Sequence, residues 1–151
     1  MIRSAEAADL DIARDLLREY AAWVGDEICF SSFEKELADL PGRYAPPDGR
    51  LLLAVSEDGS PSGCAALRRF SEDAAEMKRL YVRPGFRGSG LGRALIERII
   101  AEARVEGYAR LLLDTLPRMG DATQLYRAYG FREIPRYGDN PPEAICFALN
   151  L

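Results

Sequence analysis

The sequence contains no histidine in its 151 residues. A catalytic triad that includes histidine is therefore excluded. A zinc site is not expected either, because there is no Cys-x-x-Cys pair and no histidine can complete a ligand set. If the protein needs a base near neutral pH, that base must be a carboxylate, a tuned lysine, cysteine or tyrosine, or a water molecule.

Cysteines and long apolar runs are also scarce. Cys29, Cys64 and Cys146 are odd in number and widely spaced, which argues for a reducing compartment and against a disulfide framework. No apolar run approaches the roughly 20 residues of a membrane span, and residues 1–6 lack the apolar core of a signal peptide. We therefore expect a cytoplasmic protein that does not bind membranes.

The composition that is present is typical of a globular protein, with 48% hydrophobic and 29% charged residues. At this length we expect one domain that spans residues 1–151. The net charge of −4 argues against a general nucleic-acid binder.

Hydrophobic periodicity and turn residues predict the secondary structure. The expected elements are a strand at 1–5, helices at 9–25 and 31–40, strands at 51–55, 62–70 and 74–82, a helix at 91–103, a strand at 111–113, a helix at 121–130, and a hairpin of 131–134 with 144–149. Ser31 and Glu34 have the spacing of a capping box for the second helix. The order β-αα-βββ-α-β-α-ββ predicts a three-layer α/β/α fold with a mixed sheet and one βαβ crossover.

The strand at residues 74–82 has a break in its alternation. Its apolar positions are Ala75 and Met77, then Leu80 and Val82, so they change from odd to even numbers. A strand with a period of two does this only when one residue is extra. We therefore expect a β-bulge near Lys78 and Arg79, which would leave backbone groups unpaired.

Three glycines lie in five residues directly after this strand, in the segment Arg87-Gly88-Ser89-Gly90-Leu91-Gly92. Glycine allows a close backbone approach, and the following helix presents unpaired N–H groups and the positive end of its dipole. Together these features predict a phosphate or pyrophosphate site. A P-loop would need Gly-Lys-Ser/Thr, which is absent, and the glycine spacing does not fit the dinucleotide fingerprint Gly-x-Gly-x-x-Gly.

Read as Arg/Gln-x-x-Gly-x-Gly/Ala, residues 87–92 resemble the acyl-CoA signature of the GNAT superfamily of N-acyltransferases. The strand Glu76-Met77-Lys78-Arg79-Leu80-Tyr81-Val82 resembles the bulged fourth strand of that family. Residues 125–131, Leu-Tyr-Arg-Ala-Tyr-Gly-Phe, resemble its Leu-Tyr-x-x-x-Gly-Phe motif, and the order of elements matches throughout. The fold implied is the acyl-CoA N-acyltransferase type.

The resemblance implies that acetyl-CoA is the co-substrate and that no metal takes part. The pyrophosphate would lie on the backbone of residues 87–92, and the pantetheine arm would pair with residues 80–82. The cofactor-binding residues expected on this basis are Leu80, Tyr81, Val82, Arg87, Gly88, Ser89, Gly90, Leu91, Gly92 and Arg93. Many family members have asparagine seven residues before the motif tyrosine, but this chain has Met119, so that CoA contact is not carried over.

Acetyl transfer to an amine requires removal of a proton from the amine and protonation of the departing thiolate. Glu76, on the bulged strand, is the candidate base, and apolar strand neighbours would raise its pKa. The alternative is that Glu76 is an edge carboxylate paired with Lys78 or Arg68, and that a water chain serves as the base. Tyr126, at the tyrosine position of the motif, is the candidate acid, and the alternative is a helix tyrosine packed in the core. A backbone N–H at the bulge, near Leu80 or Tyr81, would polarise the carbonyl.

The acceptor pocket of this architecture is formed by the first two helices, their loop and the last hairpin. The candidate residues there are Trp23, Asp26, Glu27, Cys29, Phe30, Tyr137 and Asn140. We expect Cys64 and Cys146 to be buried packing residues. An acyl-cysteine route through Cys29 is not favoured, because no histidine can activate the thiol.

The sequence therefore predicts a cytoplasmic N-acetyltransferase that transfers acetyl from acetyl-CoA to a small-molecule or peptide amine in a ternary complex. It would be a monomer or a homodimer. A catalytically silent acyl-CoA sensor is the alternative, because it would bind CoA through the same residues.

Overall fold

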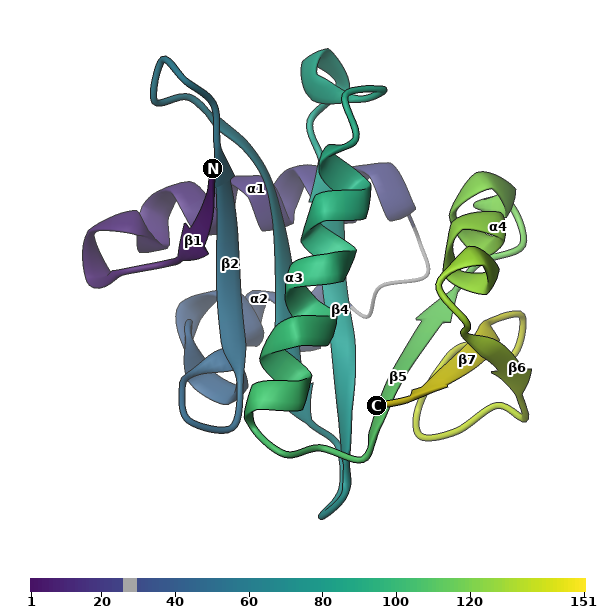
Figure 1. Ribbon diagram of the computed structural model, residues 1–151. Helices are drawn as coiled ribbons and strands as arrows, with labels where there is room; N and C mark the ends of the chain where they lie inside the picture. The colour runs from purple at the N-terminus through teal and green to yellow at the C-terminus, as the bar shows by residue number, and fades with distance from the viewer. Residues whose placement is uncertain (26–29) are drawn as a thin grey trace.

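A computed structural model describes residues 1–25 and 30–151 of the chain (Figure 1). The predicted order of elements is confirmed. The elements are β1 (Ile2–Ser4), α1 (Leu10–Val24), α2 (Phe30–Ala38), β2 (Arg50–Val55), β3 (Pro61–Arg69), β4 (Ala74–Val82), α3 (Leu91–Val105), β5 (Arg110–Thr115), α4 (Gly120–Ala128), β6 (Arg132–Ile134) and β7 (Ile145–Asn150).

Within the described residues, the strands form one mixed sheet in the order β1-β2-β3-β4-β5-β7-β6. Neighbouring strands are antiparallel, except that β4 and β5 are parallel and are joined through α3. Helix α3 lies on one face of the sheet, and α1 and α2 lie on the other (Figure 1). The predicted three-layer fold is therefore confirmed.

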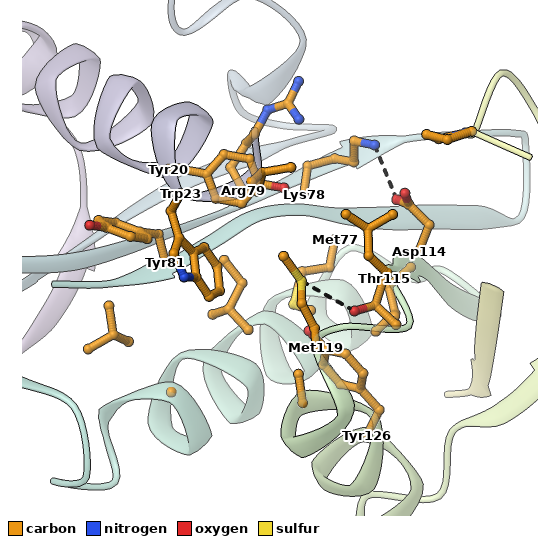
Figure 2. Close-up of a pocket in the computed structure, with 18 of the residues that line it drawn as sticks. Tyr20, Trp23, Met77, Lys78, Arg79, Tyr81, Asp114, Thr115, Met119 and Tyr126 are labelled. Carbon is orange, nitrogen blue, oxygen red and sulfur yellow. Dashed lines mark hydrogen bonds and ion pairs between the residues drawn. The ribbon is translucent and has the colours of Figure 1, made fainter. Parts of the chain in front are cut away.

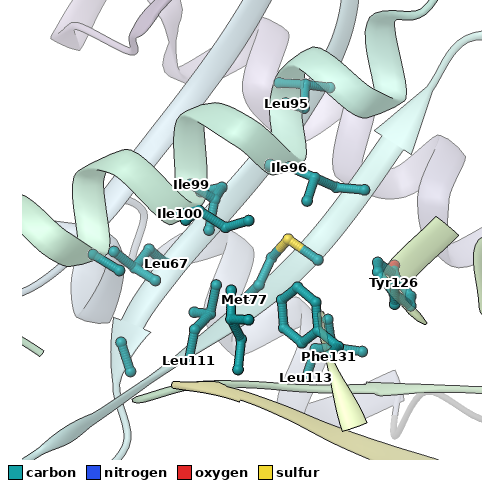
Figure 3. Close-up of a cluster of buried hydrophobic side chains, with 14 of the residues drawn as sticks. Leu67, Met77, Leu95, Ile96, Ile99, Ile100, Leu111, Leu113, Tyr126 and Phe131 are labelled. Carbon is teal, nitrogen blue, oxygen red and sulfur yellow. The ribbon is translucent and has the colours of Figure 1, made fainter. Parts of the chain in front are cut away.

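The face under α3 carries the main apolar core. The α3 side chains that periodicity predicts to be inward, Leu95, Ile96, Ile99 and Ile100 among them, are buried. Figure 3 shows these isoleucines on one side of Met77, with Leu111, Leu113 and Phe131 nearby. Apolar burial of this kind stabilises a domain by roughly 25 cal/mol per Å², so α3 is held firmly against β4 and β5.

The opposite face holds a second apolar cluster, formed by α1 and α2 with β2, β3 and β4. Leu16 and Leu17 of α1 pack there with Phe33 and Leu37 of α2. Two sequence-based details were wrong on the helices. Helix α2 begins at Phe30, so Ser31 lies inside the helix and not at the N-cap position. Ala128, predicted to face inward on α4, is exposed.

The predicted β-bulge is confirmed. Ala66 of β3 pairs with Lys78, but Cys64 pairs with Tyr81, so β4 carries one extra residue between these pairs. Arg79 has a φ of +61°, the only non-glycine residue of the described chain with a positive φ. Its Nε and Nη2 donate to the two Glu36 oxygens at 3.0 and 2.9 Å, which ties α2 to the bulge.

Strands β4 and β5 pair over only a short length. The parallel register joins Ala74 to Arg110, Ala75 to Leu111 and Glu76 to Leu112, and it stops there. Beyond Glu76 the two strands separate, although β4 continues to Val82 and β5 to Thr115 (Figure 1). The edge of β4 that faces β5 therefore has no ladder partner from residue 77 onwards.

The first prediction concerns the ion pair between Glu36 and Arg79. Glu36→Gln should lower the free energy of unfolding by about 1–3 kcal/mol, because the Arg79 guanidinium loses its charged partner in a largely buried position. Urea unfolding followed by circular dichroism would measure the change. Glu34→Gln, on the same helix, is the matched control, since Glu34 makes no ion pair within the described residues. Equal stability of the two variants would contradict the prediction.

Candidate active site

A cavity of about 1000 Å³ lies where β4 and β5 separate. Residues 77–82 of β4 and 113–115 of β5 line it, together with side chains of α1, α2 and α4. A second cavity of about 330 Å³ adjoins it near the glycine segment. The two cavities share Val82, Arg87, Gly92, Ala122 and Leu125, so one continuous cleft runs from the start of α3 to the centre of the sheet.

The glycine segment has the backbone geometry of an anion site. Gly88 and Gly90 have φ values of +81° and +85°, which disfavour side chains at both positions. The first bond within α3 runs from Ala94 N to Gly90 O, so the N–H groups of residues 91–93 have no helical partner. A Cβ added at Gly92 would meet no atom within 4 Å, so packing of the protein does not explain that glycine.

Most of the residues predicted to bind the cofactor line this cleft. Leu80, Tyr81, Val82, Arg87 and Gly92 line the large cavity, and Gly88, Gly90 and Leu91 line the small one. Ser89 and Arg93 line neither cavity. The Ser89 hydroxyl donates to Phe86 O at 2.6 Å, which closes the turn before the helix.

The Arg87 side chain lies between β4 and the end of α1. Its Nε donates to Val82 O at 2.8 Å. Its guanidinium carbon lies 5.1 Å from the ring centre of Trp23 and 5.7 Å from that of Tyr81. These distances are typical of cation–π contacts. Figure 2 shows Trp23 and Tyr81 together on one side of the cavity.

Tyr126 projects from α4 into the large cavity (Figure 2). Its ring packs against Phe131 and Phe147 at centroid distances of 5.8 and 6.1 Å. The side chain is 5% exposed, and its hydroxyl makes no hydrogen bond within the described residues. Burial raises the pKa of Tyr126 above its usual value, so the hydroxyl keeps its proton and has it free to donate.

Glu76 lies beneath the cleft and not on its wall. The side chain is 1% exposed. Its Oε1 accepts from Arg68 Nη2 at 2.7 Å and from Arg68 Nε at 2.9 Å. Its Oε2 accepts from the Tyr137 hydroxyl at 2.6 Å and lies 3.8 Å from Lys78 Nζ. The expectation of apolar neighbours around this carboxylate was therefore wrong, and the alternative, pairing with Arg68 or Lys78, is confirmed.

Lys78 and Asp114 are site residues that sequence reasoning missed. Lys78 Nζ lies 3.4 Å from Asp114 Oδ1, so this pair bridges β4 and β5 where their ladder has ended (Figure 2). Both side chains line the cavity. Alternation along β4 places Lys78 on the same face of the sheet as Glu76. No local pattern in the sequence shows that Asp114 of β5 lies across the cleft from Lys78.

The predicted acceptor-side residues have different outcomes. Trp23 lines the large cavity. Tyr137 and Asn140 lie behind its wall: the Tyr137 hydroxyl donates to Glu76, and the Asn140 amide donates to Tyr137 O at 2.9 Å. Asp26, Glu27 and Cys29 lie outside the described residues, and of Phe30 only the backbone, at the start of α2, is described.

Met119 stands at the N-cap position of α4 and lines the cavity. Its Sδ accepts a hydrogen bond from Thr115 Oγ1 at 3.6 Å (Figure 2). A thioether has no donor to offer a CoA oxygen, so this position contributes an apolar surface.

Within residues 1–25 and 30–151, no group of His, Cys, Asp and Glu side chains is arranged to hold a metal ion. No helix among those residues is long and apolar enough to cross a membrane.

A mixed sheet with a glycine-rich helix start and a cleft between separated strands is the architecture expected of an acyl-CoA-dependent acyltransferase. The chain belongs to the Acetyltransferase (GNAT) family, whose model matches residues 11–131. It is therefore an N-acetyltransferase, and enzymes of this family use acetyl-CoA.

An uncharacterised N-acetyltransferase of Schizosaccharomyces pombe is 38% identical over 145 residues, which cover 95% of this chain and 89% of the relative. The crystal structure of an acetyltransferase from Streptococcus agalactiae has a TM-score of 0.84 at 23% identity and covers 100% of this chain and 98% of its own. The N-acetyltransferase PaiA of Thermoplasma acidophilum, solved in complex with coenzyme A, has a TM-score of 0.77 at 20% identity and covers 100% and 98%. At these identities the two structures show the fold.

The expected burial of Cys64 and Cys146 is confirmed, since each is 1% exposed. Burial raises the pKa of the Cys64 thiol to about 12. Neither cysteine lines either cavity, so neither is placed to carry an acetyl group from the donor.

These cysteines generate the second prediction. In a Cys29→Ser variant, no thiol should react quickly with Ellman's reagent at pH 8, because Cys64 and Cys146 are both buried away from the reagent. The same variant unfolded in urea should release two equivalents of the coloured product, one for each remaining cysteine. A fast-reacting thiol in the folded variant would contradict the assignment of both residues to packing.

Proposed function

We propose that the protein transfers an acetyl group from acetyl-CoA directly to a primary amine while both substrates are bound. The observation that carries this proposal is the continuous cleft, which leads from the glycine segment past the open edge of β4 to a group of polar side chains. Two substrates can meet there, and no cysteine of the described residues lines the cleft. A silent sensor has no support among the relatives, which are named as acetyltransferases.

In this proposal the pyrophosphate of CoA lies on the backbone N–H groups of the segment from Arg87 to Gly92. The pantetheine arm pairs with β4 at Leu80, Tyr81 and Val82, on the edge that β5 leaves free. Arg87 donates to Val82 O in the protein alone, so this side chain must move if pantetheine takes that carbonyl.

Gly92 allows a test of the pyrophosphate site that is separate from folding. Gly92→Ala should weaken CoA binding about tenfold or more, because the added methyl group occupies space that the ligand needs. The variant should unfold at the same temperature as the wild type or higher, because alanine favours a helix over glycine. Isothermal titration calorimetry and thermal unfolding measure the two effects.

Gly85→Ala is the matched control. Gly85 also has open space where a Cβ would stand, and it lines neither cavity. We expect unchanged CoA affinity. If Gly92→Ala bound CoA as tightly as Gly85→Ala, the placement of the pyrophosphate would be wrong.

Tyr126 is the proposed general acid. Its hydroxyl lies in the cavity, stays protonated because of burial, and has no competing acceptor within the described residues. Transfer of this proton to sulfur would stabilise the CoA thiolate as the C–S bond breaks.

Glu76 or a water molecule is the proposed base. Glu76 is fully engaged by Arg68 and Tyr137, so as a base it would act through an intervening water or after a side-chain rearrangement. Asp114 is a carboxylate on the cavity wall, and its Oδ2 accepts no hydrogen bond from the described residues. It is therefore suited to hold such a water beside the amine.

The role of Tyr126 as the general acid is tested by Tyr126→Phe. We expect kcat to fall about 100-fold, because a positioned acid contributes roughly 10²–10⁴-fold to a rate. Affinity for CoA should change little. The measurement is thiol release from acetyl-CoA across a panel of amines, with calorimetry for CoA.

Tyr129→Phe is the control for this variant, because its hydroxyl bonds to Glu97 at 2.6 Å outside the cleft. Glu76→Gln and Asp114→Asn distinguish the two bases: the larger loss of kcat identifies the carboxylate that handles the proton. Unchanged rates in both Tyr126→Phe and Glu76→Gln would reject those residue assignments. CoA binding with no amine-dependent thiol release would favour the sensor.

A further inference from the structure

The acceptor half of the large cavity has cations with unused hydrogen-bond donors. An ammonium group has three donors, and charge-assisted bonds are usually about 2.7–2.9 Å long. Lys78 Nζ reaches Asp114 only at 3.4 Å and Glu76 only at 3.8 Å. Its side chain is 17% exposed and lines the cavity. An additional anionic oxygen in the cavity would complete its contacts.

Two arginines at the same cavity, Arg68 and Arg43, also have N–H donors without an acceptor among the described residues. Arg68 directs both Nε and Nη2 at a single oxygen of Glu76, and its guanidinium makes no further hydrogen bond within the described residues. Arg43 lines the same cavity and makes no ion pair within those residues. An arginine has five N–H donors in a planar fork that matches a carboxylate or a phosphonate.

The carboxylates in the same region are mostly occupied. Both Glu36 oxygens accept from Arg79, and both Glu76 oxygens accept from Arg68 or Tyr137. Asp139 also lines the wall, on the loop before β7. This leaves Asp114, beside Lys78, as the carboxylate with a free oxygen near the centre of the cleft.

We propose that the amine acceptor carries an anionic oxygen group next to its amine, as an α-amino acid or an aminoalkylphosphonate does. Its anionic group would bind Lys78 and the arginines, and its ammonium would face Asp114. The Lys78–Asp114 pair, with its charges 3.4 Å apart, complements a ligand whose own opposite charges are separated by one carbon. This inference rests on the proposed function.

The anionic group takes no part in the bond changes. The amine nitrogen forms a bond to the acetyl carbon, and the C–S bond of the thioester breaks. The nitrogen of the ammonium loses two protons in total: one reaches the CoA sulfur by way of Tyr126, and the other leaves to solvent by way of the base. The anionic group only sets the position of the amine.

The test compares matched acceptors in the thiol-release assay with the wild-type protein. For a panel of side chains, kcat/KM is measured for the amino acid, its amide, its decarboxylated amine and the corresponding aminoalkylphosphonate. We expect the best anionic acceptor to exceed its amide and its amine about tenfold or more, as one charge-assisted contact implies. Comparison of the carboxylate and phosphonate arms identifies the preferred anion.

Lys78→Met and Arg43→Met should both lower that preference. Arg43 is exposed and makes no ion pair with the residues that the structure describes, so its variant should fold even if Lys78→Met does not. CoA binding by calorimetry checks both variants. Arg69→Met is the matched control, because Arg69 follows Arg68 on β3, pairs with Asp48 and does not line the cavity. The preference should be unchanged in that variant.

The inference is wrong if amides, simple amines or peptide N-termini match or exceed the anionic acceptors, although the proposed function would then stand. It is also wrong if neither Lys78→Met nor Arg43→Met alters the preference. Absence of thiol release with every amine would instead reject the proposed function itself.

Discussion

The structure depends on a single extra residue in β4. Arg79 adopts a positive φ, and the register with β3 shifts by one residue around it. Up to Glu76 the strand pairs with β5 on its other side, and beyond Glu76 it does not. The bulge and the end of the β4–β5 ladder therefore lie together at the cleft. The bidentate bond from Arg79 to Glu36 holds the bulge in place.

The two faces of the opened sheet have different physical characters. The α3 face is apolar, with Leu95, Ile96 and Ile99 fully buried, and it provides the rigid support for the start of α3. The face toward α1 and α2 carries Arg68, Glu76 and Lys78 in one connected set of charges. Such charges are costly to bury singly and tolerable when each has a partner.

The sequence was sufficient for the order of elements and for the bulge, because both follow from periodicity. The switch from Met77 to Leu80 located the bulge within one residue. The glycine segment was also visible, since positive φ at Gly88 and Gly90 and the helix start are local properties. The surroundings of Glu76 were foreseen only in part: pairing with Lys78 or Arg68 was the alternative to apolar neighbours, and the bond from Tyr137 was not expected. Arg68 comes from the neighbouring strand and Tyr137 from the loop before β7, and only the folded register brings their donors to that carboxylate.

Asp114 is a second residue whose surroundings could not be predicted from the sequence. It follows three leucines on β5 and looks like the polar end of a buried strand. Its importance comes from the separation of β5 from β4, which turns a strand end into the wall of a cleft. Long-range pairing, and not local pattern, decides which carboxylate lines the cleft.

Trp23 is the only tryptophan in the chain, and it stands where α1 meets the cleft with 47% of its surface exposed. The guanidinium of Arg87 covers its ring at 5.1 Å. Indole emission depends on the polarity and charge of its immediate surroundings. The protein therefore carries an intrinsic fluorophore where the loop that contains Arg87 meets its first helix, and the tryptophan spectrum reports on that one location without any added label.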